Sequence, residues 1–363
     1  ELRGEHKLAL SYFEKAKEYV KNNKVFELPV IAQWDYNYSK ALFRSNQLDK
    51  ALVYAKKSLT NNQALYTPNS QKSAESLLLL AEIQAALGNY DNAIDNIGKA
   101  IQILSKTKKT DPLLVEAYRE NGSILGQAGK IIKAKEALSL GIEKALKIFG
   151  KKHPETAACY LAMAQLSLTT QDLEYGILCT QNGRLALLPF SNNLDVDLKY
   201  EPVLSSSIML QTIQLEQQLL KALYTKTPQV VYLEKIHQAA LKSEQLRIQI
   251  QSEYFNLYER TTLSKLYQRT YAEAIAAQIS LAEQQSASQK SNHYQQALIW
   301  AERSKQFQKR SLLYINTVRM TGGLSEKMKE DEVLLLKGMS QLKFDMINAS
   351  MSAPEMMEAL KEK

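Results

Sequence analysis

The chain has 363 residues, with 46 basic and 38 acidic side chains, a net charge of +8, and only 13 glycines and 8 prolines. Lysines and glutamates alternate as on solvated helix faces, which argues against a concentrated nucleic-acid-binding surface. Two cysteines form no disulfide framework, and no stretch approaches the ~20 apolar residues of a membrane span. We therefore expect a helical protein without a membrane span, in a reducing, cytoplasmic compartment.

The first half of the chain contains a segment that recurs five times. Each copy aligns on one small residue, and successive anchors are 42, 42, 41 and 42 residues apart. The anchors are Ala9, Ala51, Ala93, Ala134 and Gly176. A second small residue follows each anchor by seven positions, or two helical turns, so both lie on one helix face. These second residues are Ala16, Ser58, Ala100, Gly141 and Gly183. The period predicts stacked helices that approach one another closely at small residues.

Another helix is predicted upstream of each complete copy. In the copy anchored at Ala134 it reads "YRENGSIL", residues 118–125, which matches the W-x2-L-G-x2-Y spacing of a known helical repeat. The small position of this spacing is kept in all four complete copies, as Ser39, Ala81, Gly122 and Ala164. The large first position is replaced by Asp35 in one copy, so the period carries the argument more than any single match.

This pattern resembles the tetratricopeptide repeat (TPR) family, in the 42-residue form of kinesin-light-chain-like arrays. The resemblance covers residues 1–188 and implies an all-α fold, a right-handed α-solenoid of helix-turn-helix pairs. The first copy shows its second helix without its first helix. We therefore expect the array to begin upstream of Glu1.

A short stretch between two of these helices holds His153, Glu155 and Cys159 within seven positions. These residue types are compatible with a metal site or with a nucleophile and its base. They are equally those of a helix boundary, because Pro154 suits a first helical turn and Glu155 complements the helix dipole there. A metal site needs three or four converging ligands, which the remaining histidines do not supply. We predict a helix boundary, and neither a metal nor a cofactor site.

The second half breaks the period at residues 189–202, "PFSNNLDVDLKYEP". Longer helices are predicted after this segment, over residues 204–223, 230–251 and 253–285, followed by a helix that contains Ala297 and Ser304. We interpret these as two expanded repeats with anchors Ala239 and Ala297. The predicted domains are thus a regular array over 1–188, irregular TPR-like pairs over 189–318, and a helical linker or cap over 319–363.

Residues 301–344 resemble the segment that joins the repeats to the caspase-like domain in bacterial CHAT proteins. The matching elements are Glu302, Ser304 and Lys305, then Gly322 and Gly323, then an acidic, leucine-rich helix from Glu326 to Leu342. The alternative is a helical hairpin that caps a solenoid. The resemblance implies a regulatory array with its protease domain beyond Lys363, so we do not expect this chain itself to be an enzyme.

The first helix of each pair lines the concave groove of such a solenoid, where a protein or peptide is expected to bind. The repeat alignment places the following residues in the groove: Gln33, Tyr36, Lys40, Phe43, Glu75, Leu78, Glu82, Glu116, Arg119, Ser123, Leu161, Gln165 and Leu168. These positions do not reproduce the Lys and Asn clamp of repeats that bind acidic chaperone tails. The sequence therefore argues against that class of ligand.

Two functions remain open at this point. The first is a protein-interaction scaffold that binds a protein or peptide and regulates a downstream caspase-like domain, with which it could also make an intramolecular contact. The second is the sensor array of a bacterial signalling protein, placed before a membrane helix and a kinase or transcription module. An apolar run of ~20 residues soon after Lys363 would favour the second.

Overall fold

The computed structural model describes residues 6–23, 27–107, 111–253, 257–285 and 287–320. Within these residues the regular secondary structure consists of thirteen α-helices, without a strand. The all-α prediction is confirmed. Contacts within the chain separate two compact units, Glu1–Lys151 and Lys152–Lys363.

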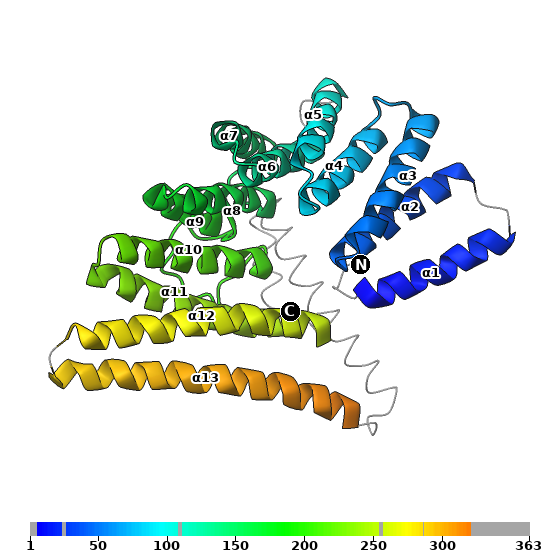
Figure 1. The fold of residues 1–363 in the computed structure, drawn as a ribbon. Helices are drawn as coiled ribbons and strands as arrows, with labels where there is room; N and C mark the ends of the chain where they lie inside the picture. Colours follow the sequence, from blue (N-terminus) through cyan, green and yellow to red (C-terminus); the bar gives the residue numbers. More distant parts are fainter. Residues whose placement is uncertain (1–5, 24–26, 108–110, 254–256, 286, 321–363) are drawn as a thin grey trace, which may run out of the picture. The chain divides into compact units, whose positions relative to one another are not determined.

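The first unit consists of helices that pack in consecutive pairs: α2 with α3, α4 with α5, and α6 with α7, while α1 lies against α2 (Figure 1). Each pair also contacts the next through its neighbouring helices. The helices are α1 (His6–Asn23), α2 (Leu28–Arg44), α3 (Leu48–Tyr66), α4 (Gln71–Ala86), α5 (Tyr90–Thr107), α6 (Pro112–Gln127) and α7 (Ile131–Ile148).

The turn within each pair has the same backbone geometry in every regular repeat. One residue of the turn has a positive φ, and these residues are Asn46, Gly88, Gly129 and Gln171. In each turn the next N–H donates to the carbonyl five residues earlier, as from Asn89 to Gln84 at 2.8 Å. This hydrogen bond closes a Schellman-type helix end, which favours glycine but here also accepts Asn and Gln. The period seen in the sequence is therefore also a period of backbone conformation.

The small anchor residues lie at the helix contacts, as predicted. Ala51, Ala93 and Ala134 are fully buried. The Ser39 hydroxyl, at the small position of α2, donates to the Ala51 carbonyl at 2.8 Å, so the hydroxyl is satisfied inside the pair. Close packing at these sites places the backbones of paired helices near one another.

Asp35 stands where the repeat usually has a large residue, and its side chain is buried. The Asn61 amide of α3 donates to the Asp35 carboxylate at 3.0 Å. Burial raises the pKa of the Asp35 carboxyl, whereas Lys57 and Asn61 act in the opposite direction. The departure from the repeat pattern is thus compensated by a polar partner on the second helix of the same pair.

Gly122 on α6 tests the importance of close approach. A Cβ added to Gly122 would overlap the buried Leu138 side chain, at 2.7 Å from Cδ2, and would lie 3.2 Å from the Ala134 carbonyl oxygen. We expect Gly122→Ala to lower the free energy of unfolding by on the order of 1–2 kcal/mol, because overpacking exceeds the gain in helix propensity. Chemical denaturation followed by circular dichroism measures this change.

Gly98 on α5 provides the matched control, since nothing lies within 4 Å of a Cβ placed there. Gly98→Ala should stabilise the chain by up to about 1 kcal/mol, through helix propensity alone. Equal effects of the two substitutions would contradict the close approach of α6 and α7 at Gly122.

The second unit contains α8 (Pro154–Thr169), α9 (Leu173–Ala186), α10 (Ser206–Lys226), α11 (Val230–Glu253), α12 (Leu257–Glu283) and α13 (Ala287–Met320). Helices α8 and α9, α10 and α11, and α12 and α13 pack as pairs (Figure 1). The predicted anchors Ala239 and Ala297 are buried on α11 and α13. The long helices expected after residue 203 are therefore present, with ends shifted by a few residues.

The segment between α9 and α10, residues 187–205, is packed onto the second unit. Leu187, Leu188 and Leu198 are buried in its hydrophobic core. Two lysines from outside the segment donate to its backbone: Lys152 to the Ser191 carbonyl and Lys242 to the Val196 carbonyl. The break in the sequence period thus corresponds to an anchored connection within one core.

At the other end of the second unit, α11, α12 and α13 meet around the fully buried Trp300. The Trp300 indole N–H donates to His237 Nδ1 at 3.2 Å, and Arg303 lies over the indole ring. Of the predicted linker elements, Glu302, Ser304 and Lys305 are on α13. Gly322, Gly323 and the segment Glu326–Leu342 lie outside the described residues.

Candidate functional site

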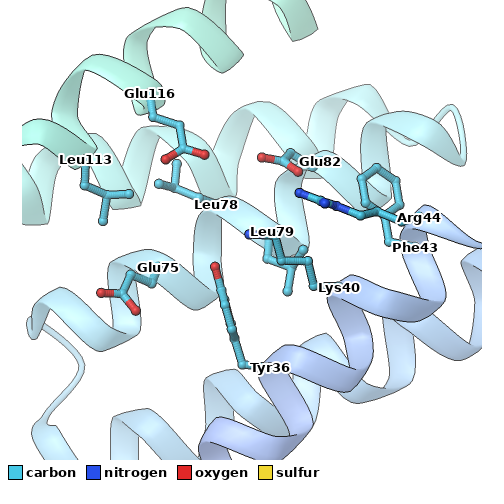
Figure 2. A pocket seen from close by; sticks show the side chains of 10 residues that line it. All are labelled: Tyr36, Lys40, Phe43, Arg44, Glu75, Leu78, Leu79, Glu82, Leu113 and Glu116. Carbon is cyan, nitrogen blue, oxygen red and sulfur yellow. The ribbon is translucent and has the colours of Figure 1, made fainter. Parts of the chain in front are cut away.

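A pocket of about 220 Å³ opens between three helices of the first unit (Figure 2). All three, α2, α4 and α6, are the first helices of consecutive pairs. The lining residues are Tyr36, Lys40, Phe43, Arg44, Glu75, Leu78, Leu79, Glu82, Leu113 and Glu116. The pocket therefore lies on the helices that the repeat alignment assigns to the groove.

The predicted groove residues fall into three groups. One group lines the pocket: Tyr36, Lys40, Phe43, Glu75, Leu78, Glu82 and Glu116. A second group belongs to the same helices but does not line it: Gln33, Arg119 and Ser123. The third group lies on α8 in the second unit: Leu161, Gln165 and Leu168.

Three lining residues were not among the predicted ones: Arg44, Leu79 and Leu113. Arg44 is the last residue of α2, and Leu113 lies in the first turn of α6. Leu79 follows the predicted Leu78, so it lies on the flank of the same helix face. Leu113 could have been found from its spacing, because it precedes Glu116 by three positions, as neighbours on one face do.

Helical spacing explains how each element presents its side chains. Tyr36, Lys40 and Phe43 are four and three positions apart, which places them in one row on α2. Glu75, Leu78 and Glu82 form the corresponding row on α4. The two rows combine an apolar floor with charged side chains, and Figure 2 shows both rows facing the same space.

The charges of the pocket are segregated between its walls. Both basic residues, Lys40 and Arg44, come from α2, whereas Glu75 and Glu82 come from α4 and Glu116 from α6. Figure 2 shows the Glu82 and Glu116 carboxylates pointing toward one another above Leu78. The α4 and α6 walls are therefore acidic, and the α2 wall is basic.

Glu82 has the most perturbed ionisation of these residues. Burial raises the pKa of the Glu82 carboxyl from its ordinary value of 4.5 to about 8, and the nearby Glu120 and Glu116 carboxylates raise it further. Arg119 and Lys40 act in the opposite direction, with smaller effects on this pKa. Glu82 therefore lies in a net negative potential, in spite of two cationic neighbours.

Some charges near the pocket already have partners. Lys72 donates to Glu75 at 2.7 Å, and Arg119 donates to Glu120 at 2.6 Å. These ion pairs are partly exposed. They leave Arg119 directed to Glu120 on its own helix, so it does not form a hydrogen-bonded pair with Glu82 in the described part of the chain.

The size of the pocket limits what it can accept. Sites for small-molecule ligands and cofactors usually enclose about 300–1,000 Å³, which is larger than this pocket. A space of about 220 Å³ suits one or two side chains of a longer ligand. The rows of charged and apolar residues then determine which side chain fits.

The stretch His153-Pro154-Glu155 forms the start of α8, as predicted. His153 is the N-cap residue, and its Nδ1 accepts a hydrogen bond from the Glu155 N–H at 3.1 Å. Cys159 is buried on the same helix, and burial raises the pKa of the other thiol, Cys179, to about 11. A protonated, buried thiol is a poor nucleophile, so the structural interpretation of this stretch accounts for the geometry.

Two searches across the described residues bear on other classes of site. No group of three or more His, Cys, Asp or Glu side chains in that part of the chain is arranged to hold a metal ion. None of the described helices is both long enough and apolar enough to cross a membrane.

The helix pairs, their repeated turns and the pocket on their first helices define a TPR-like α-helical repeat fold. A family model described as "Tetratricopeptide repeat" matches residues 30–106, which include all of α2 to α4 and nearly all of α5. No curated protein matched the chain. TPR-like repeats typically mediate contacts between proteins, and they are generally scaffolds without catalytic activity.

Solved structures show the same fold at low sequence identity. BtubC (BKLC) from P. vanneervenii is 13% identical, with a TM-score of 0.51 over 69% of this chain and 92% of that one. A Podosopora anserina protein with nearly identical TPR-like repeats is 14% identical, with a TM-score of 0.49 over 61% and 99%. A Rap protein complexed with Competence and Sporulation Factor is 13% identical, with a TM-score of 0.48 over 81% and 79%.

Proposed function

We propose that this chain is a protein-interaction array that binds a peptide segment of another protein in the pocket between α2, α4 and α6. The observation that carries this proposal is the pocket itself, which is formed by the first helices of three consecutive pairs. A peptide lying along these helices would place side chains into the pocket while its backbone crossed the rows of polar residues.

The aromatic residues of α2 provide the expected anchor contacts. Tyr36 and Phe43 are partly buried and line the pocket, so both offer apolar area to a ligand without being core residues. Aromatic side chains in such positions commonly carry much of the binding free energy of an interface. Truncating either one should therefore weaken binding more than it weakens the fold.

The test uses peptides selected on the whole chain from a random twelve-residue display library. We expect Tyr36→Ala and Phe43→Ala each to weaken the selected peptides by at least about tenfold, in keeping with ~1.4 kcal/mol or more for an anchor residue. Fluorescence anisotropy with the synthetic peptides measures the dissociation constants.

Tyr66→Ala is the matched control, because Tyr66 is an exposed tyrosine at the end of α3 and does not line the pocket. It should change the dissociation constants by less than about twofold, since surface side chains outside an interface contribute little. Thermal unfolding of each variant separates lost binding from lost structure. Equal effects of Tyr36→Ala and Tyr66→Ala in folded proteins would rule out the pocket as the peptide site.

At a finer level, we propose that the array regulates a caspase-like protease domain. The support is the pattern formed by Glu302, Ser304 and Lys305 together with residues 322–342, most of which lie outside the described residues. The alternative, a sensor array in a bacterial signalling protein, rests on the same repeats. The reading frame after residue 363 distinguishes them: separated His and Cys motifs support the protease, and an apolar run of ~20 residues supports the sensor.

A further inference from the structure

The Glu82 carboxylate is the unusual feature of the pocket. It is largely enclosed by neighbouring side chains, yet its interactions within the described residues are long-range charge effects without a side-chain hydrogen bond. A buried carboxylate is normally hydrogen-bonded or ion-paired, because its desolvation is otherwise uncompensated. Figure 2 shows Glu82 directed into the pocket space, where a ligand group would meet it.

A second carboxylate faces the same space from another helix. Glu116 on α6 lines the pocket opposite Glu82 on α4, and Leu78 lies between them on the floor. Their mutual repulsion contributes to the perturbed ionisation of Glu82. Two carboxylates held near one another form a site for a cation, which would relieve both the repulsion and the missing hydrogen bonds.

The apolar residues of the pocket fit the stem of a long cationic side chain. Tyr36 and Leu113 line the pocket on either side of Leu78, so they offer a path of apolar contacts toward the two carboxylates. Lysine and arginine bury their methylene stems against such surfaces while the charged group reaches polar partners. A pocket of about 220 Å³ has room for one such side chain.

We propose that the pocket selects peptides by a lysine or arginine side chain, whose charged group is held between Glu82 and Glu116. This inference rests on the proposed function, because it names the ligand chemistry of the same pocket. Lys40 and Arg44, on the basic α2 wall, would then face the backbone carbonyls or an acidic flanking residue of the peptide.

An acidic anchor at Lys40 and Arg44 is the competing possibility. The potential at Glu82 argues for the cation, because the effects of Glu120 and Glu116 on its ionisation exceed those of Arg119 and Lys40. Arg44 is also exposed at the end of α2, so water already solvates it. The enclosed acidic wall gains more from a ligand charge than the solvated basic wall does.

The experiment compares peptides selected on the wild-type chain with their substituted forms. We expect selected peptides to share one Lys or Arg, and replacement of that residue by norleucine or citrulline to weaken binding at least tenfold. Glu82→Gln/Glu116→Gln should weaken the parent peptide at least tenfold, and the uncharged analogue by less than threefold. Glu136→Gln, an exposed substitution on α7, should leave both affinities unchanged.

The pH dependence gives a second readout. A cationic anchor favours the ionised Glu82 carboxylate, so affinity should rise several-fold between about pH 6 and about pH 8.5 for the charged peptide and stay flat for its norleucine analogue. The charged groups that face Glu82 are Lys40 and Arg44 of α2, Glu75 of α4, and Glu116, Arg119 and Glu120 of α6. Glu82→Gln should therefore remove most of the rise.

The outcomes distinguish this inference from the proposed function. Peptides that lose affinity in Tyr36→Ala, but carry no basic anchor and ignore Glu82→Gln/Glu116→Gln, would overturn the cationic anchor and leave peptide binding standing. Enrichment of Asp or Glu anchors would do the same and assign recognition to the α2 wall. A library that yields no peptide sensitive to Tyr36→Ala would overturn both proposals.

Discussion

Glu82→Gln is expected to make the chain more stable at high pH while leaving its stability at low pH nearly unchanged. Burial and the neighbouring carboxylates raise the folded-state pKa of Glu82 to about 8, against an ordinary value of 4.5. The folded chain therefore holds a proton that the unfolded chain releases above pH 4.5. This stabilisation is complete below that pH and is lost as the pH rises through about 8.

The expected size follows from the width of this pH interval. Each pH unit inside it changes the free energy of unfolding by up to about 1.4 kcal/mol, so a loss on the order of 2–4 kcal/mol is expected between about pH 5 and about pH 8.5. Glutamine resembles the protonated acid and cannot ionise, so the variant should lack this part of the loss. Urea unfolding at both pH values, followed by Trp34 fluorescence in a Trp300→Phe background, reports on the first unit.

Glu136→Gln serves as the control, because it removes an exposed carboxylate from the same unit. Its stability should follow the wild type at both pH values. A pH dependence of unfolding that is the same for the wild type and Glu82→Gln would show that the Glu82 carboxyl is solvated. The argument for an enclosed, acidic pocket wall would then fail.

The second large effect is expected at Arg184, which forms a buried ion pair in the second unit. Arg184 Nη1 lies 2.8 Å from Glu216 Oε2, and the two side chains are only 8% and 11% exposed. Arg184→Met would leave the Glu216 carboxylate buried without its counterion. Breaking one side of a buried pair typically costs about 3–5 kcal/mol, so we expect a loss of this size in the unfolding of the second unit.

The double variant Arg184→Met/Glu216→Leu should recover most of this loss, because apolar replacement removes both desolvated charges. Lys221→Met is the comparison at an exposed pair, since Lys221 and Glu273 are 2.8 Å apart but 56% and 26% exposed. It should cost less than about 1 kcal/mol. Trp300 fluorescence in a Trp34→Phe background follows the second unit, and similar losses for Arg184→Met and Lys221→Met would contradict a buried pair.

The helical repeats were predictable because their signal is local. Small residues at fixed spacing mark the helix contacts, and Ala51, Ala93 and Ala134 are indeed fully buried. Pro154 predicts the start of α8 because a proline ring fixes a backbone angle that suits the first turn. Such information lies within a few residues of each element, so a single sequence contains it.

The anchored segment between α9 and α10 was less accessible to prediction. The sequence shows only that the period stops near Pro189, whereas the anchoring depends on Lys152 and Lys242, which reach backbone carbonyls far along the chain. Arg184 likewise finds Glu216 across 32 residues. Pairings of this kind depend on tertiary placement, and no spacing rule predicts them.

The pocket is intermediate between these cases. The repeat alignment could assign Tyr36, Lys40 and Glu82 to a groove face, because residues seven or fewer positions apart share a helix side. It could not predict which section of the face is enclosed, since that depends on the bulk of Leu79 and Leu113 at the edges. It also gave no indication of the raised pKa of Glu82, which arises from residues on neighbouring helices as well as from its own burial.

The repeated positive-φ turns at Asn46, Gly88, Gly129 and Gln171 have a consequence for how the chain folds. Each turn is closed by a hydrogen bond that spans only five residues, and each brings together two helices that are adjacent in sequence. Closing such short loops costs little chain entropy, so a helix pair can assemble before its neighbours do. Folding can therefore start at any of several hairpins and spread outward from the first that forms.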